Sequence, residues 1–84
     1  MATVSFHYWA GARAAAGVEW ESVEADTVAA ALGVVGEKRN DPRFQRILNV
    51  SSILVDSRVV RGAELSRPLT TPVEVEVLPP FAGG

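Results

Sequence analysis

Residues 73–84 read VEVEVLPPFAGG, and this stretch contains the clearest structural signal in the chain. Valine alternates with glutamate in its first half, which predicts a β-strand over residues 73–78 with β-branched side chains inward and carboxylates toward solvent. Pro79 and Pro80 cannot donate backbone hydrogen bonds and favour an extended conformation. We therefore expect the strand to end there and the following residues to leave the body of the protein.

The rest of this stretch, Phe81-Ala82-Gly83-Gly84, carries the candidate chemistry. Gly83 and Gly84 have no side chains, so they fit a passage too narrow for any Cβ. A carboxylate on Gly84 becomes an electrophile once ATP converts it to an acyl-adenylate, and a sulfur nucleophile can then attack it. Two terminal glycines alone are often only a frayed end. Their setting after a strand, two prolines and an aromatic residue favours a functional tail.

The first part of the chain predicts two paired strands. Alternation over residues 3–9 gives one strand with two faces, Val4, Phe6 and Tyr8 on one and Ser5, His7 and Trp9 on the other. Residues 10–16 are alanine-rich and predict a turn or two of helix that stops at Gly17. Residues 18–23 predict a second strand that pairs with the first as a hairpin. We expect Trp20 on it to be core or half-buried sheet packing.

The middle of the chain predicts two helices and two short strands. Asp26 is a plausible N-cap for an amphipathic helix whose apolar side chains are Val28, Ala31, Leu32 and Val35. Asp41-Pro42 is a second helix start, followed by the apolar side chains of Phe44, Ile47 and Leu48. Residues 52–55 and 58–60 predict strands joined by a turn at Asp56-Ser57, and residues 61–72 show little periodicity.

These elements predict an α+β domain of the β-grasp, or ubiquitin-like, type. The order is two strands, a main helix, a short helix and three more strands, which gives a mixed sheet of about five strands packed on the helices. In that fold the last strand lies in the centre of the sheet, beside the first and parallel to it. We expect residues 1–78 to form this domain and residues 79–84 to be a flexible tail.

Composition excludes several classes of function. The chain has 84 residues and a formal net charge of -2, which argues against a nucleic-acid partner. It has no cysteine, which excludes disulfides, a thiolate zinc site and a cysteine nucleophile. His7 is the only histidine and has no triad partner or metal-ligand spacing. No signal peptide or membrane-length apolar run is visible, so we expect a soluble cytoplasmic protein without a membrane partner.

Two motifs carry a resemblance to a known family. The run Leu78-Pro79-Pro80-Phe81-Ala82-Gly83-Gly84 resembles the ending of MoaD-type proteins, the small subunit of molybdopterin synthase in the MoaD/ThiS ubiquitin-like family. Near the start, Ala10-x-x-Arg13-x-x-x-Gly17 after an aromatic strand resembles the first strand and turn of that family. The chain departs from the family at two turns, with Asp56-Ser57 in place of Asn-Gly and Thr70-Thr71-Pro72 in place of Gly-Asp.

The resemblance implies a mechanism in which the chain holds no cofactor and offers no catalytic residues of its own. A MoeB-type enzyme would use ATP to adenylate the carboxylate of Gly84, and a persulfide donor would convert it to a thiocarboxylate. The tail, comprising Pro79, Pro80, Ala82 and Gly83 as well as Gly84, would enter a MoaE-type large subunit. There the sulfur would pass to cyclic pyranopterin monophosphate, within a heterodimer or heterotetramer.

Three side chains are candidates for partner contacts. We expect Phe81 to anchor in a pocket of the partner rather than fold back onto its own sheet. Trp9 would mark a docking site if its face of the sheet is uncovered, and it would otherwise pack locally. Arg13 matches the arginine of the family and is expected either to contact a partner or to be a plain surface residue.

Two other functions remain open from the sequence. The same fold and Gly-Gly end would serve a sulfur carrier for thiazole, cysteine or tRNA thiolation, or a ubiquitin-like protein modifier. A β-grasp interaction module without covalent chemistry would have no use for Gly83 and Gly84. The Pro79-Pro80-Phe81 sequence favours the molybdopterin pathway among these.

Overall fold

The computed structural model describes residues 1–80, so the predictions made for Phe81, Ala82, Gly83 and Gly84 lie outside the described residues. Within that part of the chain, five strands form one mixed sheet in the order β2-β1-β5-β3-β4. Their bounds are β1 (Ala2–Tyr8), β2 (Trp20–Ala25), β3 (Ser52–Val55), β4 (Arg58–Val59) and β5 (Val73–Leu78). Strand β5 lies beside β1 and parallel to it, as predicted, and the other pairings are antiparallel.

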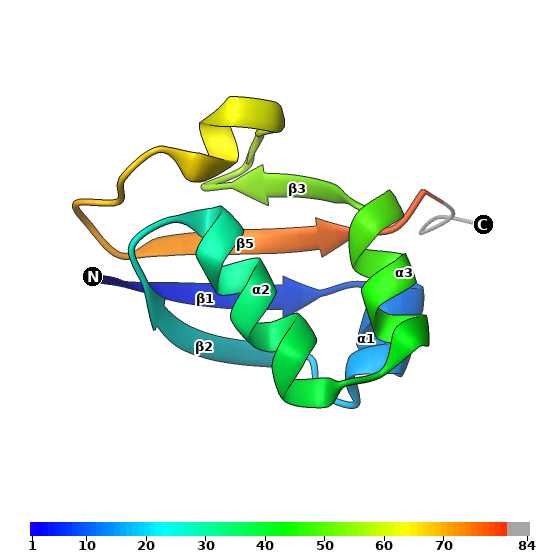
Figure 1. The fold of residues 1–84 in the computed structure, drawn as a ribbon. Coiled ribbons are helices and arrows are strands. Elements are labelled where there is room, and N and C mark those ends of the chain that lie inside the picture. The colour runs from blue at the N-terminus through cyan, green and yellow to red at the C-terminus, as the bar shows by residue number, and fades with distance from the viewer. Residues whose placement is uncertain (81–84) are drawn as a thin grey trace.

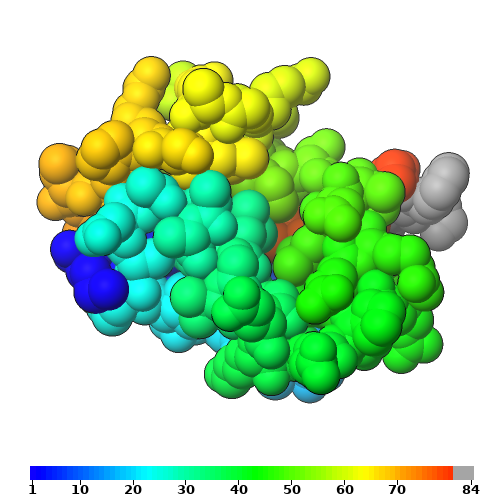
Figure 2. Space-filling model, viewed as in Figure 1, coloured from blue at the N-terminus to red at the C-terminus, as the bar shows by residue number. Residues whose placement is uncertain are grey.

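Helices cover one face of this sheet. They are α1 (Ala10–Ala16), α2 (Val28–Arg39) and α3 (Pro42–Val50), together with one 3-10 turn, η1 (Gly62–Ser66). Helices α2 and α3 lie across the sheet in Figure 1, and their side chains hide most of the strands in Figure 2. The predicted main helix and short helix are therefore confirmed, and the 3-10 turn lies in the segment for which the sequence showed little periodicity. None of the helices within residues 1–80 has the length and apolar character that a membrane span requires.

The hydrophobic core lies between the helices and the two central strands. Val4, Phe6 and Tyr8 of β1 are fully buried, as are Val75 and Val77 of β5. The Phe6 and Tyr8 rings lie parallel with 5.9 Å between their centroids, and Phe44 of α3 meets Tyr8 edge-on at 5.6 Å. The alternation in the sequence thus identified the core face of both strands.

Two local predictions are wrong. The N-cap of α2 is Thr27 rather than Asp26, because the Thr27 hydroxyl accepts a hydrogen bond from the Ala30 N–H at 3.0 Å. The carbonyl of Asp26 instead accepts a hydrogen bond from the Leu69 N–H. Strand β2 begins at Trp20 and continues to Ala25, because its pairing with β1 extends to Ala2.

Turn geometry explains how the short connections close. Gly17 ends α1 with φ at 81°, and its N–H donates to the Arg13 carbonyl at 2.9 Å. Between β3 and β4, Asp56 and Ser57 both have positive φ, at 48° and 71°. Two consecutive left-handed residues correspond to a type I′ turn, the hairpin turn whose twist matches the flanking strands. Asp56 is held by the β5 backbone, since its carboxylate accepts a hydrogen bond from the Glu74 N–H at 3.0 Å.

We predict that Ser57→Gly stabilises the protein. Ser57 is exposed and carries a Cβ at a φ of 71°, where glycine is favoured. Relief of this strain should raise the free energy of unfolding by about 0.5–1 kcal/mol after the entropy of glycine is subtracted. Urea denaturation measures the change, with Ser57→Ala as the control because it removes the hydroxyl and keeps the Cβ. Equal stability of the glycine and alanine variants would contradict the turn assignment.

Candidate functional site

The tail leaves the domain from the centre of the sheet. Strand β5 ends at Leu78, which pairs with Ser52 of β3, and its neighbour Val77 pairs with Tyr8 of β1. The N–H of Trp9 donates to the carbonyl of Val77 at 3.2 Å, so the last residues of the strand are held from both sides. The domain therefore fixes the point from which the tail departs.

The described part of the tail is short. Pro79 is half-buried and Pro80 is exposed, and both follow the end of β5 as the sequence predicted. Phe81, Ala82, Gly83 and Gly84 lie outside the described residues, so their roles stay predictions.

The face of the sheet opposite the helices carries a row of three aromatic rings, which we call the aromatic row: Trp9, His7 and Trp20. The imidazole of His7 lies 4.2 Å from the Trp20 ring and parallel to it, and 4.4 Å from the Trp9 ring at 57°. Both indoles are about half exposed, Trp20 at 54% and Trp9 at 42%. Of the two alternatives predicted for Trp20, a place in the core is wrong, because Trp20 pairs with His7 on the open face and packs there against the imidazole with about half of its surface exposed. Trp9 lies on that face as the alternation indicated.

Carboxylates hold the aromatic row in place. Glu19 lies 3.1 Å from His7 Nε2, and Glu76 lies 4.0 Å from His7 Nδ1. The indole N–H of Trp9 donates to the same Glu76 carboxylate at 3.2 Å. The alternation of β5 predicted only a solvent-facing carboxylate at this position. Glu76 in fact connects β5, and hence the start of the tail, to the aromatic row.

Arg13 lies beside this cluster. Its guanidinium lies 3.5 Å from the Glu19 carboxylate, and its side chain is mostly exposed. A shallow depression of about 400 Å³ lies next to the row and is lined by Ala10, Arg13, Ala14, Gly17, Val18 and Glu19. The structure thus brings Trp9 and Arg13 to one side of the molecule through their separate contacts with Glu76 and Glu19. Contact of either residue with a partner stays a prediction.

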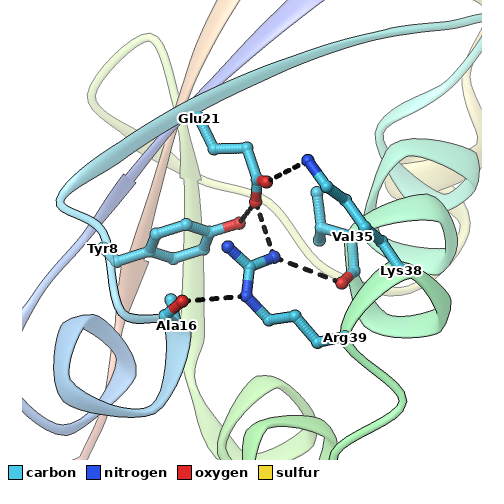
Figure 3. Close-up of polar contacts among 6 residues, drawn as sticks. All are labelled: Tyr8, Ala16, Glu21, Val35, Lys38 and Arg39. Atoms are coloured by element: carbon cyan, nitrogen blue, oxygen red, sulfur yellow. Dashed lines mark hydrogen bonds and ion pairs between the residues drawn. The ribbon is translucent and has the colours of Figure 1, made fainter.

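A second polar cluster, on the helix-covered side of the sheet, was missed by the sequence analysis (Figure 3). The Glu21 carboxylate accepts hydrogen bonds from the Tyr8 hydroxyl at 2.7 Å, from Arg39 at 2.7 Å and from Lys38 at 3.0 Å. Arg39 also donates to the carbonyls of Ala16 and Val35. The cluster therefore ties β1, β2, the end of α1 and the end of α2 together.

The groups of this cluster shift the pKa values of Glu21 and Tyr8. Burial tends to raise the pKa of Glu21, but hydrogen bonds from Arg39, Tyr8 and Lys38 outweigh it and lower that pKa from 4.5 to about 2. Burial, reinforced by the Glu21 carboxylate, raises the pKa of Tyr8 far above its ordinary value. Glu21 occupies a helix-facing position of β2, opposite Phe6, and a charged residue in such a position signals a buried partner. This cluster is a structural support rather than a reactive site, since its groups are engaged with one another.

Residues 1–80 contain no group of three or more histidine, aspartate or glutamate side chains able to hold a metal ion. The larger hollow of about 470 Å³ on the helical side is lined mainly by apolar side chains, including Leu32, Leu48, Ile53 and Leu65.

Comparison with protein families gives one match, to the family model described as the ThiS family, over residues 6–84. The match spans nearly the whole chain and includes the Gly83-Gly84 end. Comparison with curated proteins gives no match.

Solved structures share the fold at low sequence identity. The putative molybdopterin converting factor subunit 1 from Pyrococcus furiosus is 22% identical, with a TM-score of 0.76 and coverage of 95% of this chain and 99% of that one. The small archaeal modifier protein 1 from Methanosarcina acetivorans is 23% identical, with a TM-score of 0.79 and coverage of 100% and 98%. A chain in the complex of subunits 1 and 2 of the molybdopterin-converting factor from Helicobacter pylori is 18% identical, with a TM-score of 0.71 and coverage of 98% and 99%. These similarities confirm the predicted β-grasp, ubiquitin-like fold.

We predict that Glu21→Gln destabilises the protein by about 2 kcal/mol at neutral pH, because the half-buried Arg39 loses its counter-charge. The folded pKa of Glu21, about 2, lies below its ordinary value of 4.5. The stabilisation is therefore fully present above pH 4.5 and is lost as the pH falls toward 2.

Urea denaturation of both proteins at neutral pH and at about pH 3 measures this loss. The stability gap between wild type and Glu21→Gln should narrow at the lower pH. The control is Glu37→Gln, an exposed glutamate of α2, which should show no gap at either pH. A gap of the same size at both pH values would contradict the assigned ionisation.

Proposed function

The chain belongs to the ThiS family of ubiquitin-like sulfur carriers, and from this premise we propose that it delivers sulfur for molybdopterin synthesis through the carboxylate of Gly84. The observation that carries the chemistry at Gly84 is the family match, which extends through residue 84 and so includes the Gly83-Gly84 end. The position of β5 supports it, because the strand is hydrogen-bonded on both sides up to the residues where the tail begins.

The proposed chemistry is an activation followed by a sulfur transfer. A carboxylate oxygen of Gly84 bonds to the α-phosphorus of ATP and pyrophosphate leaves, which gives an acyl-adenylate. The terminal sulfur of a persulfide then attacks the carbonyl carbon and expels AMP, and a thiol cleaves the resulting sulfur–sulfur bond. The products are a thiocarboxylate on Gly84 and a disulfide on the donor. ATP is a substrate of a MoeB-type adenylating enzyme in this scheme, and the chain itself holds no cofactor.

The proposed acceptor step takes place in a large subunit of the MoaE type. The tail from Pro79 to Gly84 enters that subunit, and its glycines allow the backbone to pass where a side chain would not. Phe81 anchors the tail in a pocket of the same subunit. The thiocarboxylate sulfur then attacks a side-chain carbon of cyclic pyranopterin monophosphate and displaces an oxygen substituent. Water hydrolyses the resulting thioester, which leaves the sulfur on the pterin and restores the Gly84 carboxylate. One solved neighbour is a complex of subunits 1 and 2 of a molybdopterin-converting factor, which supports a large-subunit partner for this chain.

The second candidate is a carrier or modifier for a different acceptor. Two observations favour it: the matching family model is described as ThiS, and small archaeal modifier proteins are among the solved neighbours. A modifier would use the same acyl-adenylate but would transfer the Gly84 carbonyl to an amine of another protein. The Pro79-Pro80-Phe81 sequence before the glycines favours the molybdopterin acceptor.

We predict that the chain gains the mass of one oxygen-to-sulfur exchange when incubated with ATP, its adenylating enzyme and a persulfide donor. Intact-mass spectrometry measures the gain, and fragmentation should place it on Gly84. The control is the chain without Gly84, which folds with the same β5 but should show no exchange. If the full chain shows no exchange with enzymes that are active on another carrier, the result would contradict the proposed sulfur-carrier chemistry at Gly84.

We further predict that the thiocarboxylated chain supports molybdopterin formation when mixed with a purified MoaE-type large subunit and cyclic pyranopterin monophosphate. Fluorescence of the oxidised pterin product measures the reaction. The unmodified chain is the control and should give no product. Formation of amide-linked conjugates in place of molybdopterin would instead establish the modifier function.

A further inference from the structure

A hollow on the helical side of the sheet lies close to the point where the tail begins. It has a volume of about 470 Å³, and its wall includes Ser51, Ser52 and Ile53 at the start of β3, so we call it the β3 hollow. Ser52 is the register partner of Leu78, the last residue of β5. The start of β3 and the end of β5 therefore lie at the same end of the sheet, close to α3 (Figure 1). The tail thus begins one strand away from the β3 hollow.

The β3 hollow is largely apolar and only partly covered. Leu32 of α2, Leu48 of α3 and Leu65 of η1 line it and are partly buried. Val59 of β4 also lines it and remains 47% exposed. A group that covers these side chains removes apolar area from water, which is favourable. The volume lies within the range of small-ligand pockets, about 300–1,000 Å³, so it has room for an aromatic ring.

One cation lies at the edge of the β3 hollow. Arg61 is exposed, and among residues 1–80 it is the only charged residue that lines the hollow. Arg58 in the same segment is paired with Glu64 at 3.8 Å, whereas no carboxylate of residues 1–80 lies within ion-pair distance of Arg61. An apolar hollow beside a guanidinium suits a ligand that combines an aromatic group with a carboxylate.

The tail of this chain supplies both groups. Phe81 is its one large aromatic side chain, and the carboxylate of Gly84 follows three residues later. An extended chain spans at most about 3.5 Å per residue, so Phe81 can lie roughly 10 Å from Leu78 and the carboxylate roughly 10 Å farther. Neighbouring strands are about 4.8 Å apart, so this reach is enough to cross the start of β3. Pro80 lies in a turn, so the direction of β5 is not continued into the tail.

We propose that the tail docks on its own domain in the free protein, with the phenyl ring of Phe81 in the β3 hollow and the carboxylate of Gly84 paired with Arg61. The tether favours this occupant over others, because a short linker gives the tail an effective concentration in the millimolar range. The tail of a second copy, or a similar segment of a partner, would compete for the hollow only at its bulk concentration. The docked tail is an autoinhibitory contact, because it withholds the carboxylate from an enzyme that modifies it.

The docking itself is independent of the proposed function, and only its consequence rests on that function. Phe81 leaves the β3 hollow before it enters the pocket of a large subunit, and the carboxylate leaves Arg61 before it is adenylated. The apparent affinity of the adenylating enzyme is therefore reduced in proportion to the fraction of chains whose tail is undocked.

Solution NMR of the full-length chain tests the docking. Nuclear Overhauser contacts are expected between the ring of Phe81 and the methyl groups of Leu48 and Leu65. The ring-current shifts of these methyl groups should disappear in Phe81→Ala, a substitution outside the folded domain. Absence of the contacts, together with identical methyl shifts in the wild type and Phe81→Ala, overturns the proposal.

Arg61→Gln tests the charge pairing. This variant should weaken the contacts of Phe81 and move the methyl shifts toward those of Phe81→Ala. Added salt should have the same effect on the wild type, because it screens a surface ion pair. The matched control is Arg43→Gln, an exposed arginine of α3 that does not line the β3 hollow, and it should keep the wild-type shifts. If Arg61→Gln also keeps them, the pairing assigned to Gly84 is wrong.

Protein concentration and mixed labelling identify the occupant. The methyl shifts of the wild type should not change on dilution, as expected for a contact within one chain. Overhauser contacts from the Phe81 ring of an unlabelled chain to the methyl groups of a labelled chain would assign the β3 hollow to the tail of a second copy. That result overturns the proposal.

Adenylation kinetics test the autoinhibition. With the purified adenylating enzyme, Arg61→Gln should lower KM about threefold and leave kcat within about twofold, whereas Arg43→Gln should leave both unchanged. An unchanged or higher KM in Arg61→Gln overturns the autoinhibitory role. A wild-type chain that is never adenylated by an enzyme active on another carrier overturns the proposed function, while contacts of Phe81 in the NMR experiment still establish the docking.

Discussion

The parallel pairing of β1 with β5 is the constraint on which the rest of the structure depends. It brings the first strand of the chain against the last, with Phe6 opposite Val75 and Tyr8 opposite Val77, and both partners are fully buried on the helix side. Strands β2 and β3 then add to its two outer edges. Because residues from opposite ends of the chain must meet to form this pair, the tail begins at a position that the whole fold determines.

Adjacent residues of β1 serve the two faces of the sheet in different ways. Tyr8 points to the helices, where its hydroxyl shares the Glu21 carboxylate with Arg39 in a mostly buried cluster. Its neighbour His7 points to the open face, where it stacks on Trp20 and meets Glu19. On the helix side, the Glu21 carboxylate is paired with both Lys38 and Arg39, and these contacts stabilise the fold. Charges on the open face keep solvent access, so they remain able to bind a partner.

The sequence was sufficient to predict the strands and core residues that follow a short periodicity. It did not reveal the features that depend on contacts between distant residues. The alternation of valine in β5 and of aromatic residues in β1 sufficed for the core, because a strand with one buried face must repeat every two residues. Asp26 and Thr27 are both competent N-caps, and only the position of the backbone decides between them. The sequence gives no signal for the role of Glu21, because its partner Arg39 lies far away in the sequence. Trp20 looked apolar enough for the core, yet the register of β2 with His7 places it on the open face.

The same distinction, between what the sequence predicts and what only the fold reveals, applies to the candidate site. The chemistry proposed for the tail was predicted from residue types alone. The proximity of Trp9, Glu76 and Arg13 became visible only in the folded structure. An extended segment spans at most about 3.5 Å per residue, so the six residues from Pro79 to Gly84 can carry a carboxylate roughly 20 Å beyond the end of β5. In the proposed function, that reach would let a partner hold the reacting carbon inside its own active site, at a distance from the folded domain. The reaction proposed at Gly84 would therefore take place away from the surface of the folded domain, and only contacts made in the transition state of that reaction would change its rate.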